Sequence, residues 1–289
     1  MKKFRLRRRR RRRLPKPERV PVRTIVPNLI TSLAACAGIT SIALSASGRW
    51  HAALWALLTA CVCDGMDGRV ARLLNASSKL GAELDSLADF VNFGVAPAMF
   101  MFFWHTGGPA HEGFDPRVVR FVLGCALFYS LCDCFRLARF NTMLEQPVIP
   151  YWKHFFLGVP APGGAWMVLT PAMISLELKD AAPALYAFLR HPAAGAAMLL
   201  AVGALMASRL PTISLKSIHI RKAHLLPTMA GLFLLIALLV SDFWLSIGVA
   251  GLVYIVTVPV TGAIFLRIRA RWFKTQESAA ANPAPAAAQ

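Results

Sequence analysis

Acidic side chains are scarce in this sequence, which has 14 Asp and Glu residues against 32 Lys and Arg residues and a net charge of +18. Polar residues in general are a minority, because 56% of the residues are hydrophobic and the mean hydropathy is +0.53. A soluble domain of 289 residues would have to leave much of this apolar surface in contact with water. The composition therefore argues against a soluble domain and favours a membrane protein.

Cysteine and histidine patterns typical of metal sites are also missing. The histidines are scattered, and no H-x-x-x-H pair places two of them on one helical face. The cysteines include two C-x-C pairs, but residues two apart point away from each other on a helix. We therefore expect free cysteines that pack as small hydrophobic residues, not zinc ligands or a disulfide.

Long apolar runs predict an all-α integral membrane protein. About 20 apolar residues cross the bilayer core as a helix. On that basis we expect about eight spans, at residues 26–47, 51–74, 80–104, 118–141, 155–176, 191–208, 224–243 and 244–266. A basic disordered tail (1–24) then precedes the transmembrane domain (25–272), and an Ala/Pro-rich disordered tail (273–289) follows it.

The distribution of basic residues predicts the orientation of these spans. If both termini are cytoplasmic, the outer side receives only Arg49, Arg117, Arg120, Lys179 and Arg190. All other Lys and Arg residues then lie on the inner side, as the positive-inside rule requires. We therefore expect a multi-pass protein of the inner membrane with both termini in the cytoplasm.

The unbroken arginine run from Arg7 to Arg13 has three interpretations. Such a run can bind nucleic acid or anionic lipid. Beside a membrane domain we favour anionic membrane lipid and expect no nucleic-acid partner. The alternative is a solvated tail that only fixes the topology.

Four aspartates lie within the second and third predicted spans: Asp64, Asp67, Asp85 and Asp89. An acidic side chain at the centre of a membrane helix costs about 2.5–3.5 kcal/mol on insertion scales. Clustered carboxylates would also repel one another, so a divalent cation is their natural partner. The alternative is helix packing through small residues, with the acids paired to Arg69 and Arg72.

Helical spacing predicts that these acids come together. At about 100° per residue, one stripe of the second span carries Asp64, Asp67, Gly68, Ala71 and Arg72, and one face of the third carries Gly81, Asp85 and Asp89. Two antiparallel helices joined by a short inner loop would bring stripe and face together near the cytoplasmic surface. The small residues would leave room for a substrate between them.

The same residues resemble a known family. The sequence reads Asp64-Gly-Met-Asp67-Gly68-Arg-Val-Ala71-Arg72, then eight residues to Gly81, followed by Asp85 and Asp89 at intervals of four. Every fixed position of the CDP-alcohol phosphotransferase signature is matched. The resemblance implies a six-helix core, extended here by two C-terminal helices. It also implies an enzyme that moves a phosphatidyl group from a CDP-activated lipid to an alcohol and releases CMP.

The resemblance further implies a role for each matched residue. Two divalent ions, Mg²⁺ or Mn²⁺, would be held by Asp64, Asp67 and Asp85, with Asp89 near the second ion and acting as the general base. The implied contacts to the CDP-lipid are Asn28, Thr31, Gly68, Ala71, Arg72 and Gly81.

Further stretches are similar to the bacterial membrane-integral phosphatidylserine synthases within that family. They are Pro27-Asn28-Leu-Ile-Thr31, Asp89-Phe-Val-Asn-Phe93-Gly94-Val-Ala96-Pro97, Arg136-Leu-Ala-Arg139-Phe-Asn141, Phe156-Leu-Gly158-Val-Pro160-Ala-Pro162 and Ser208-Arg209-Leu-Pro211-Thr212-Ile-Ser214-Leu-Lys216. This likeness implies CDP-diacylglycerol and L-serine as substrates, and a homodimer. Two residues depart from it: Asn92 replaces an expected serine, and Asp133 precedes Arg136.

The acceptor pocket is predicted from cations at the level of the aspartates. A serine carboxylate needs a fixed cation, and an arginine can bind it through two hydrogen bonds. Arg136, Arg139 and Lys216 are therefore candidate contacts to the serine carboxylate or to phosphate. Alternatively, they are positive-inside residues that contact lipid phosphates.

Other functions stay open at this point. A sibling enzyme would use glycerol 3-phosphate, inositol phosphate or choline, although choline would favour an aromatic cage over an arginine. A cation-coupled transporter also places acids in the membrane, but usually with inverted repeats, and we find none. A basic membrane anchor for nucleic acid would explain the arginine run and leave the four aspartates unexplained.

Overall fold

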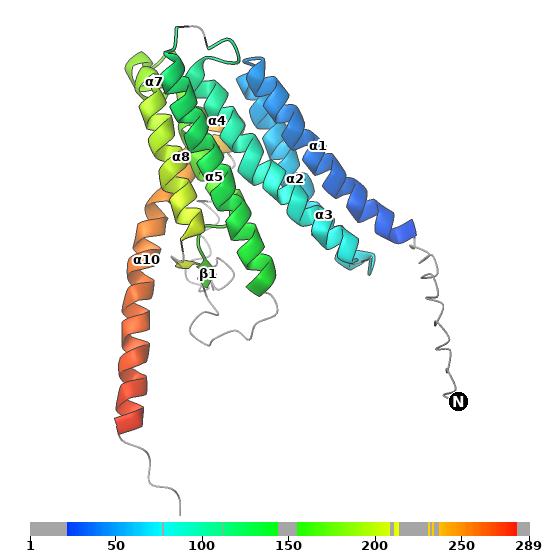
Figure 1. Cartoon of the computed structure of the whole chain (residues 1–289), viewed down its shortest axis with the longest axis vertical. Helices are drawn as coiled ribbons and strands as arrows, with labels where there is room; N and C mark the ends of the chain where they lie inside the picture. The colour runs from blue at the N-terminus through cyan, green and yellow to red at the C-terminus, as the bar shows by residue number, and fades with distance from the viewer. Residues whose placement is uncertain are drawn as a thin grey trace, which may run out of the picture.

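The computed structural model of the chain describes residues 22–76, 78–111, 113–143, 155–208, 211–213, 231, 233 and 237–281. Most of these residues are helical (Figure 1). The principal α-helices are α1 (Ile25–Ala46), α2 (Trp50–Leu73), α3 (Lys79–Asp89), α4 (Ala96–Thr106), α5 (Pro116–Met143), α6 (Ala161–Glu177), α7 (Pro183–Leu189), α8 (Pro192–Ala207) and α10 (Phe243–Ala281). A 3-10 turn, η1 (Val22–Thr24), precedes α1, and a π-helical segment, η2 (Phe90–Val95), joins α3 to α4.

Several of these helices are long and apolar enough to cross a bilayer. Two of them are the helices α1 and α5. The others are the continuous run Lys79–Thr106, which comprises α3, η2 and α4, and the segment Phe243–Gly262 of α10. The pair α7–α8, bent by 54°, makes a fifth if it is counted as one span. The prediction of an all-α membrane protein is confirmed. The number of eight spans stays a prediction, and its seventh span, 224–243, lies mostly outside the described residues.

Small residues form the contact between α1 and α2, while large ones face outward. On α1, Ala34, Gly38 and Ser41 are buried, whereas Leu29 and Leu33 are more than half exposed. Small side chains let two helix backbones approach closely, which is how membrane helices associate. The Ser41 hydroxyl donates to the Ala53 carbonyl of α2 at 2.9 Å, which ties the two helices together.

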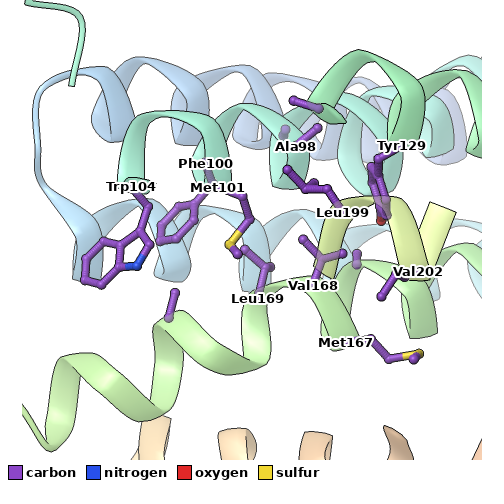
Figure 2. Close-up of a cluster of buried hydrophobic side chains, with 14 of the residues drawn as sticks. Ala98, Phe100, Met101, Trp104, Tyr129, Met167, Val168, Leu169, Leu199 and Val202 are labelled. Atoms are coloured by element: carbon purple, nitrogen blue, oxygen red, sulfur yellow. The ribbon is translucent and has the colours of Figure 1, made fainter. Parts of the chain in front are cut away.

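The core lies between α4, α5, α6 and α8 (Figure 2). Phe100, Met101 and Trp104 of α4 are fully buried there against α6 and α8. Trp50 of α2 packs edge-on against Trp104, with ring centroids 5.0 Å apart. This core gives α4 a fixed position, and α4 continues the helical run that carries two of the four aspartates.

One end of the bundle gathers the elements that surround the aspartate motif. The first turn of α1, the first turn of α3, the end of α5 and β1 all lie at the same end in Figure 1. The C-terminal half of α10 (orange to red) projects beyond this end. The short strands β1 (Phe155–Leu157) and β2 (Pro211–Ile213) form an antiparallel pair here, with Phe156 opposite Thr212.

Two predicted boundaries are wrong. The fifth span does not start at residue 155, because residues 155–157 form β1, Gly158 has φ +77° and the helix begins only at Ala161. A positive φ interrupts a helix. Pro160 is then the N-cap residue of the new helix, and Pro162 lies in its first turn. At the other terminus, α10 continues to Ala281, although a disordered tail was predicted from residue 273. Residues 1–21 and 282–289 lie outside the described residues.

The prediction of free cysteines is confirmed for all six.

Candidate active site

Three aspartates from two helices meet at one point. Asp64 and Asp67 come from α2 and Asp85 from α3, and one carboxylate oxygen of each lies within 4.8 Å of the other two. Asp89, one turn further along α3, is outside this group and interacts electrostatically with Asp64. The structure thus brings three of the four aspartates together, as helical spacing predicted, with Asp89 on the next turn of the same helix as Asp85.

This cluster has the donor set of a divalent-cation site. Oxygen ligands from carboxylates suit Mg²⁺ and Mn²⁺. One oxygen of Asp64, Oδ1, is buried and receives no hydrogen bond. No Lys or Arg side chain in the described part of the chain forms an ion pair with Asp64, Asp67 or Asp85. The alternative that Arg69 and Arg72 neutralise the aspartates is therefore wrong, and a bound cation fits the uncompensated charge.

A hydroxyl on α1 fixes the orientation of Asp67. Thr31 Oγ1 donates to Asp67 Oδ2 at 2.5 Å, and both residues are buried. A hydrogen bond to a carboxylate is stronger than one between neutral groups. The remaining oxygen, Asp67 Oδ1, is within 2.5 Å of the Gly68 amide nitrogen. α1 therefore contributes to the site although it carries none of the aspartates.

We expect Thr31→Val to weaken metal binding. Valine keeps the shape of threonine but cannot hold the Asp67 carboxylate, and losing such an outer partner typically costs about 10- to 100-fold in metal affinity. Titration of the purified protein with Mn²⁺, followed by electron paramagnetic resonance, measures this affinity. Ser32→Ala is the matched control, because the Ser32 hydroxyl is exposed and binds only a carbonyl of its own helix. Equal Mn²⁺ affinities in the two variants would contradict the role given to Thr31.

A cavity of about 170 Å³ opens beside the aspartates. Residues from α1, from α2 and from the start of α3 line it: Pro27, Asn28, Thr31, Asp67, Gly68, Ala71, Ala76, Ser78, Gly81, Ala82 and Asp85. Five of the six residues predicted to contact a CDP-lipid are in this set. The sixth, Arg72, does not line the cavity, and its Nε donates to the Gly68 carbonyl at 3.0 Å.

Glycine keeps this cavity open at the start of α3. A Cβ on Gly81 would lie 3.0 Å from Asn28 Oδ1 and 3.1 Å from Ser78 Oγ, closer than side chains normally pack. Ser78 is the N-cap of α3, and its hydroxyl accepts a hydrogen bond from the Gly81 amide at 3.0 Å. The same residues thus start the helix and shape the cavity.

Arg136 lies near the C-terminal end of α5. Its side chain is 14% exposed, and Nη1 lies 3.9 Å from Asp133 Oδ1 on the same helix. Its charge is also attracted by that of Asp89 on α3. Arg136 therefore lies within electrostatic range of Asp89, and its contact with an acceptor stays a prediction.

The other two predicted cations have different positions. Arg139 donates to the carbonyls of Ala207 and Ser208, each at 3.1 Å, and so binds the C-terminal end of α8. Cations are favourable at this end of a helix. Lys216 lies outside the described residues.

The π-helical segment η2 directly follows Asp89 and packs against α5. Tyr129 donates to the Phe93 carbonyl at 2.9 Å, and Ser130 donates to the Gly94 carbonyl at 3.1 Å. These bonds from α5 satisfy carbonyls that a π-helix displaces from the regular ladder. Such segments frequently occur at functional sites.

Sequence reasoning gave no role to Ser78, Ser86 or Asn141. Asn141 Nδ2 donates to Ser86 Oγ at 3.1 Å, which joins the end of α5 to α3 between Asp85 and Asp89. Ser78 could have been recognised from the sequence as a helix N-cap, because serine is a preferred N-cap residue and an apolar-periodic segment follows it. The contact between Asn141 and Ser86 joins residues 55 positions apart, so no local pattern predicts it.

Residues 24–207 match the family model described as CDP-alcohol phosphatidyltransferase. A relative in Mycobacterium leprae, named CDP-diacylglycerol–serine O-phosphatidyltransferase, is 40% identical over 166 residues, 57% of this chain and 51% of the relative. Relatives of the same name are 35% identical over 147 residues in Helicobacter pylori strain J99 (50% and 56% of the two chains) and 38% identical over 117 residues in Bacillus subtilis (39% and 55%). The matched part of the chain spans about half the length of these relatives.

Proposed function

We propose, because the chain belongs to the CDP-alcohol phosphatidyltransferase family, that it transfers the phosphatidyl group of CDP-diacylglycerol to L-serine and releases CMP. The observation that carries this proposal is the meeting of Asp64, Asp67 and Asp85 beside a cavity lined by the residues of the family motif. Phosphoryl-transfer chemistry needs charge neutralisation at the phosphates and a positioned nucleophile. The cluster supports the first requirement, and Asp89 supports the second.

The metal ligands in this proposal are Asp64, Asp67 and Asp85, with Asp89 beside a second ion. When bound, Mg²⁺ or Mn²⁺ would neutralise charge on the pyrophosphate and on the departing CMP. Asn28 and Gly81 would contact the CDP moiety in the cavity. Thr31 would hold the Asp67 carboxylate in place during the reaction.

Asp89 is proposed as the general base. Its carboxylate would accept the proton of the acceptor hydroxyl as that oxygen forms the new bond to phosphorus. The bond from the same phosphorus to the CMP oxygen breaks, so the products are a phosphodiester and CMP. Asp89 suits this role because it interacts with Asp64 of the metal-binding group and attracts Arg136 on α5.

L-Serine as the acceptor is supported by the names of the relatives and by Arg136. A guanidinium can bind a carboxylate through two hydrogen bonds. Arg136 is a better candidate than Arg139, whose guanidinium binds the end of α8. Glycerol 3-phosphate, inositol phosphate and choline are the competing acceptors.

The experiment that tests the function is CMP release by the purified protein with CDP-diacylglycerol and a panel of acceptors. We expect serine to be the best acceptor. Ethanolamine, which lacks the carboxylate, should be poor. Equal turnover of serine and ethanolamine would contradict the carboxylate contact, and faster turnover of glycerol 3-phosphate would assign a sibling activity.

Arg136→Lys should raise the apparent KM for serine about 30-fold, the lower limit for losing a partner of a buried charge. Lysine keeps the charge but not the planar pair of donors. The KM for CDP-diacylglycerol should change much less, because the cavity for CDP is on the α1 side of the aspartates. Arg120→Lys, at the opposite end of α5, is the control and should leave both KM values unchanged.

The cellular arrangement is part of the proposal. The positive-inside distribution supports an inner-membrane protein with cytoplasmic termini and a cytoplasmic active site. The basic tail around Arg7–Arg13 would bind anionic lipid, at about 1 kcal/mol per basic residue near the surface. A homodimer is proposed from the family resemblance alone.

A further inference from the structure

The carboxylate of Asp133 on α5 has no role in the reaction described above and no local hydrogen-bond partner. The residue is fully buried, and both of its carboxylate oxygens lack a hydrogen bond. An ionisable group in this position is costly in a membrane helix unless another group compensates for it. Within the described part of the chain, Asp133 forms an ion pair with Arg136 at 3.9 Å.

The fold makes room for Asp133. Its oxygen Oδ2 lies so close to Gly94 that a Cβ at that position would be 2.7 Å away. Tyr129 and Ser130, on the same part of α5, already donate to the carbonyls of η2. Neither oxygen of Asp133 makes a hydrogen bond, so Asp133 adds no such bond to the helix contact. Packing of α5 on η2 therefore does not explain an acid here.

Arg136 is attracted by two carboxylates. Asp133, one turn earlier on α5, pairs with its guanidinium at 3.9 Å, and Asp89, the proposed base on α3, attracts it electrostatically. If Asp133 did not hold Arg136, Asp89 would be left to attract the guanidinium. That pair would occupy both the base and the cation that an acceptor needs.

We propose that Asp133 is a positioning residue that holds Arg136 away from Asp89 and ready for the carboxylate of the acceptor. This inference rests on the proposed function, since it assumes an acceptor that Arg136 binds. It also accounts for the buried acid one turn before the arginine. Asp133 acts through Arg136 and does not itself touch the acceptor.

The test is a double-mutant cycle with Asp133→Asn and Arg136→Gln in the full-length protein. Asp133→Asn should raise the apparent KM for serine about tenfold, because residues in contact are coupled by energies of this order. The KM for CDP-diacylglycerol should stay within about twofold. In the Arg136→Gln background, Asp133→Asn should add almost nothing, because there is no guanidinium left to hold. Independent, multiplying effects in the double variant would overturn the proposal.

Tyr129→Phe separates positioning from a merely structural effect. It removes a hydrogen bond between α5 and η2 but leaves the ion pair of Asp133 and Arg136 in place. It should lower the melting temperature without changing the KM for serine. If Asp133→Asn behaved in the same way as Tyr129→Phe, Asp133 would be structural only.

A second measurement is independent of turnover. Phenylglyoxal modifies free guanidinium groups, and mass spectrometry of the digested protein gives the rate at Arg136. Asp133→Asn should change this rate several-fold, and an unchanged rate would count against the proposal.

If the unmodified protein uses another acceptor, the proposed serine specificity fails, and the double-mutant cycle is then measured with the KM of that acceptor. If it uses no acceptor, the proposed activity fails and the labelling rate alone decides about Asp133.

Discussion

Removal of divalent ions should abolish CMP release, and added Mg²⁺ or Mn²⁺ should restore it. Asp64, Asp67 and Asp85 place three carboxylates within 4.8 Å, with no Lys or Arg ion pair among the described residues to offset them. Without a cation the carboxylates repel one another, and the phosphates of the donor meet negative charge. Dialysis against EDTA, followed by readdition of each metal, measures the effect.

The control for chelation is the fold itself. Metal binding often contributes to local order as well as to chemistry, so loss of activity on chelation has to be separated from unfolding. Circular dichroism of the chelated protein should show its helices intact, because the core around Phe100 and Trp104 does not include the aspartates. Full turnover by thoroughly chelated protein would contradict the metal site.

Asp89→Asn should lower turnover by about 10²- to 10⁴-fold, the usual contribution of a general base. Asparagine keeps the size of aspartate and part of its capacity as a ligand, but it cannot accept the proton of the acceptor hydroxyl. Binding of CDP-diacylglycerol should persist, because Asp89 does not line the cavity beside Asn28 and Gly81. Single-turnover CMP release and equilibrium binding of the donor together measure the two effects.

Asp67→Asn is the matched comparison for this prediction. Asp67 lines the cavity and belongs to the metal-binding group, so its neutralisation should weaken donor and metal binding as well as turnover. Asp67→Asn and Asp89→Asn should thus both lose turnover, but only Asp67→Asn should also bind the donor and the metal more weakly. Near-normal turnover of Asp89→Asn would remove Asp89 from the role of base.

The aspartate cluster was predictable because its spacing is local. Asp64 and Asp67 share one face of α2, Asp85 and Asp89 share one face of α3, and a short connection leaves these helices few ways to pack. The boundaries of α1, α2 and α5 were also close, since apolar length fixes a membrane helix within a few residues. Five of the six residues carried over from the family motif line one cavity for the same reason.

The features that sequence could not predict depend on contacts between distant segments. The strand at Phe155–Leu157 needs its partner Pro211–Ile213, and neither has the length or alternation of an ordinary strand. The π-helical turn after Asp89 depends on hydroxyls of α5, 36 residues away in sequence. Arg139 was read as an acceptor contact because its charge was visible, whereas its carbonyl partners on α8 were not.

The close contact of α1 with its neighbours has an evolutionary consequence. A Cβ added at Gly38 would collide with the side chain of Asn92, which is buried in η2. Leu29 and Leu33, by contrast, face outward and can change to other apolar residues with little structural effect. Tolerance to substitution should therefore be the reverse of that in a soluble protein. Along α1 the bulky positions are free to drift, and the small ones, which pack against α2 and η2, are constrained.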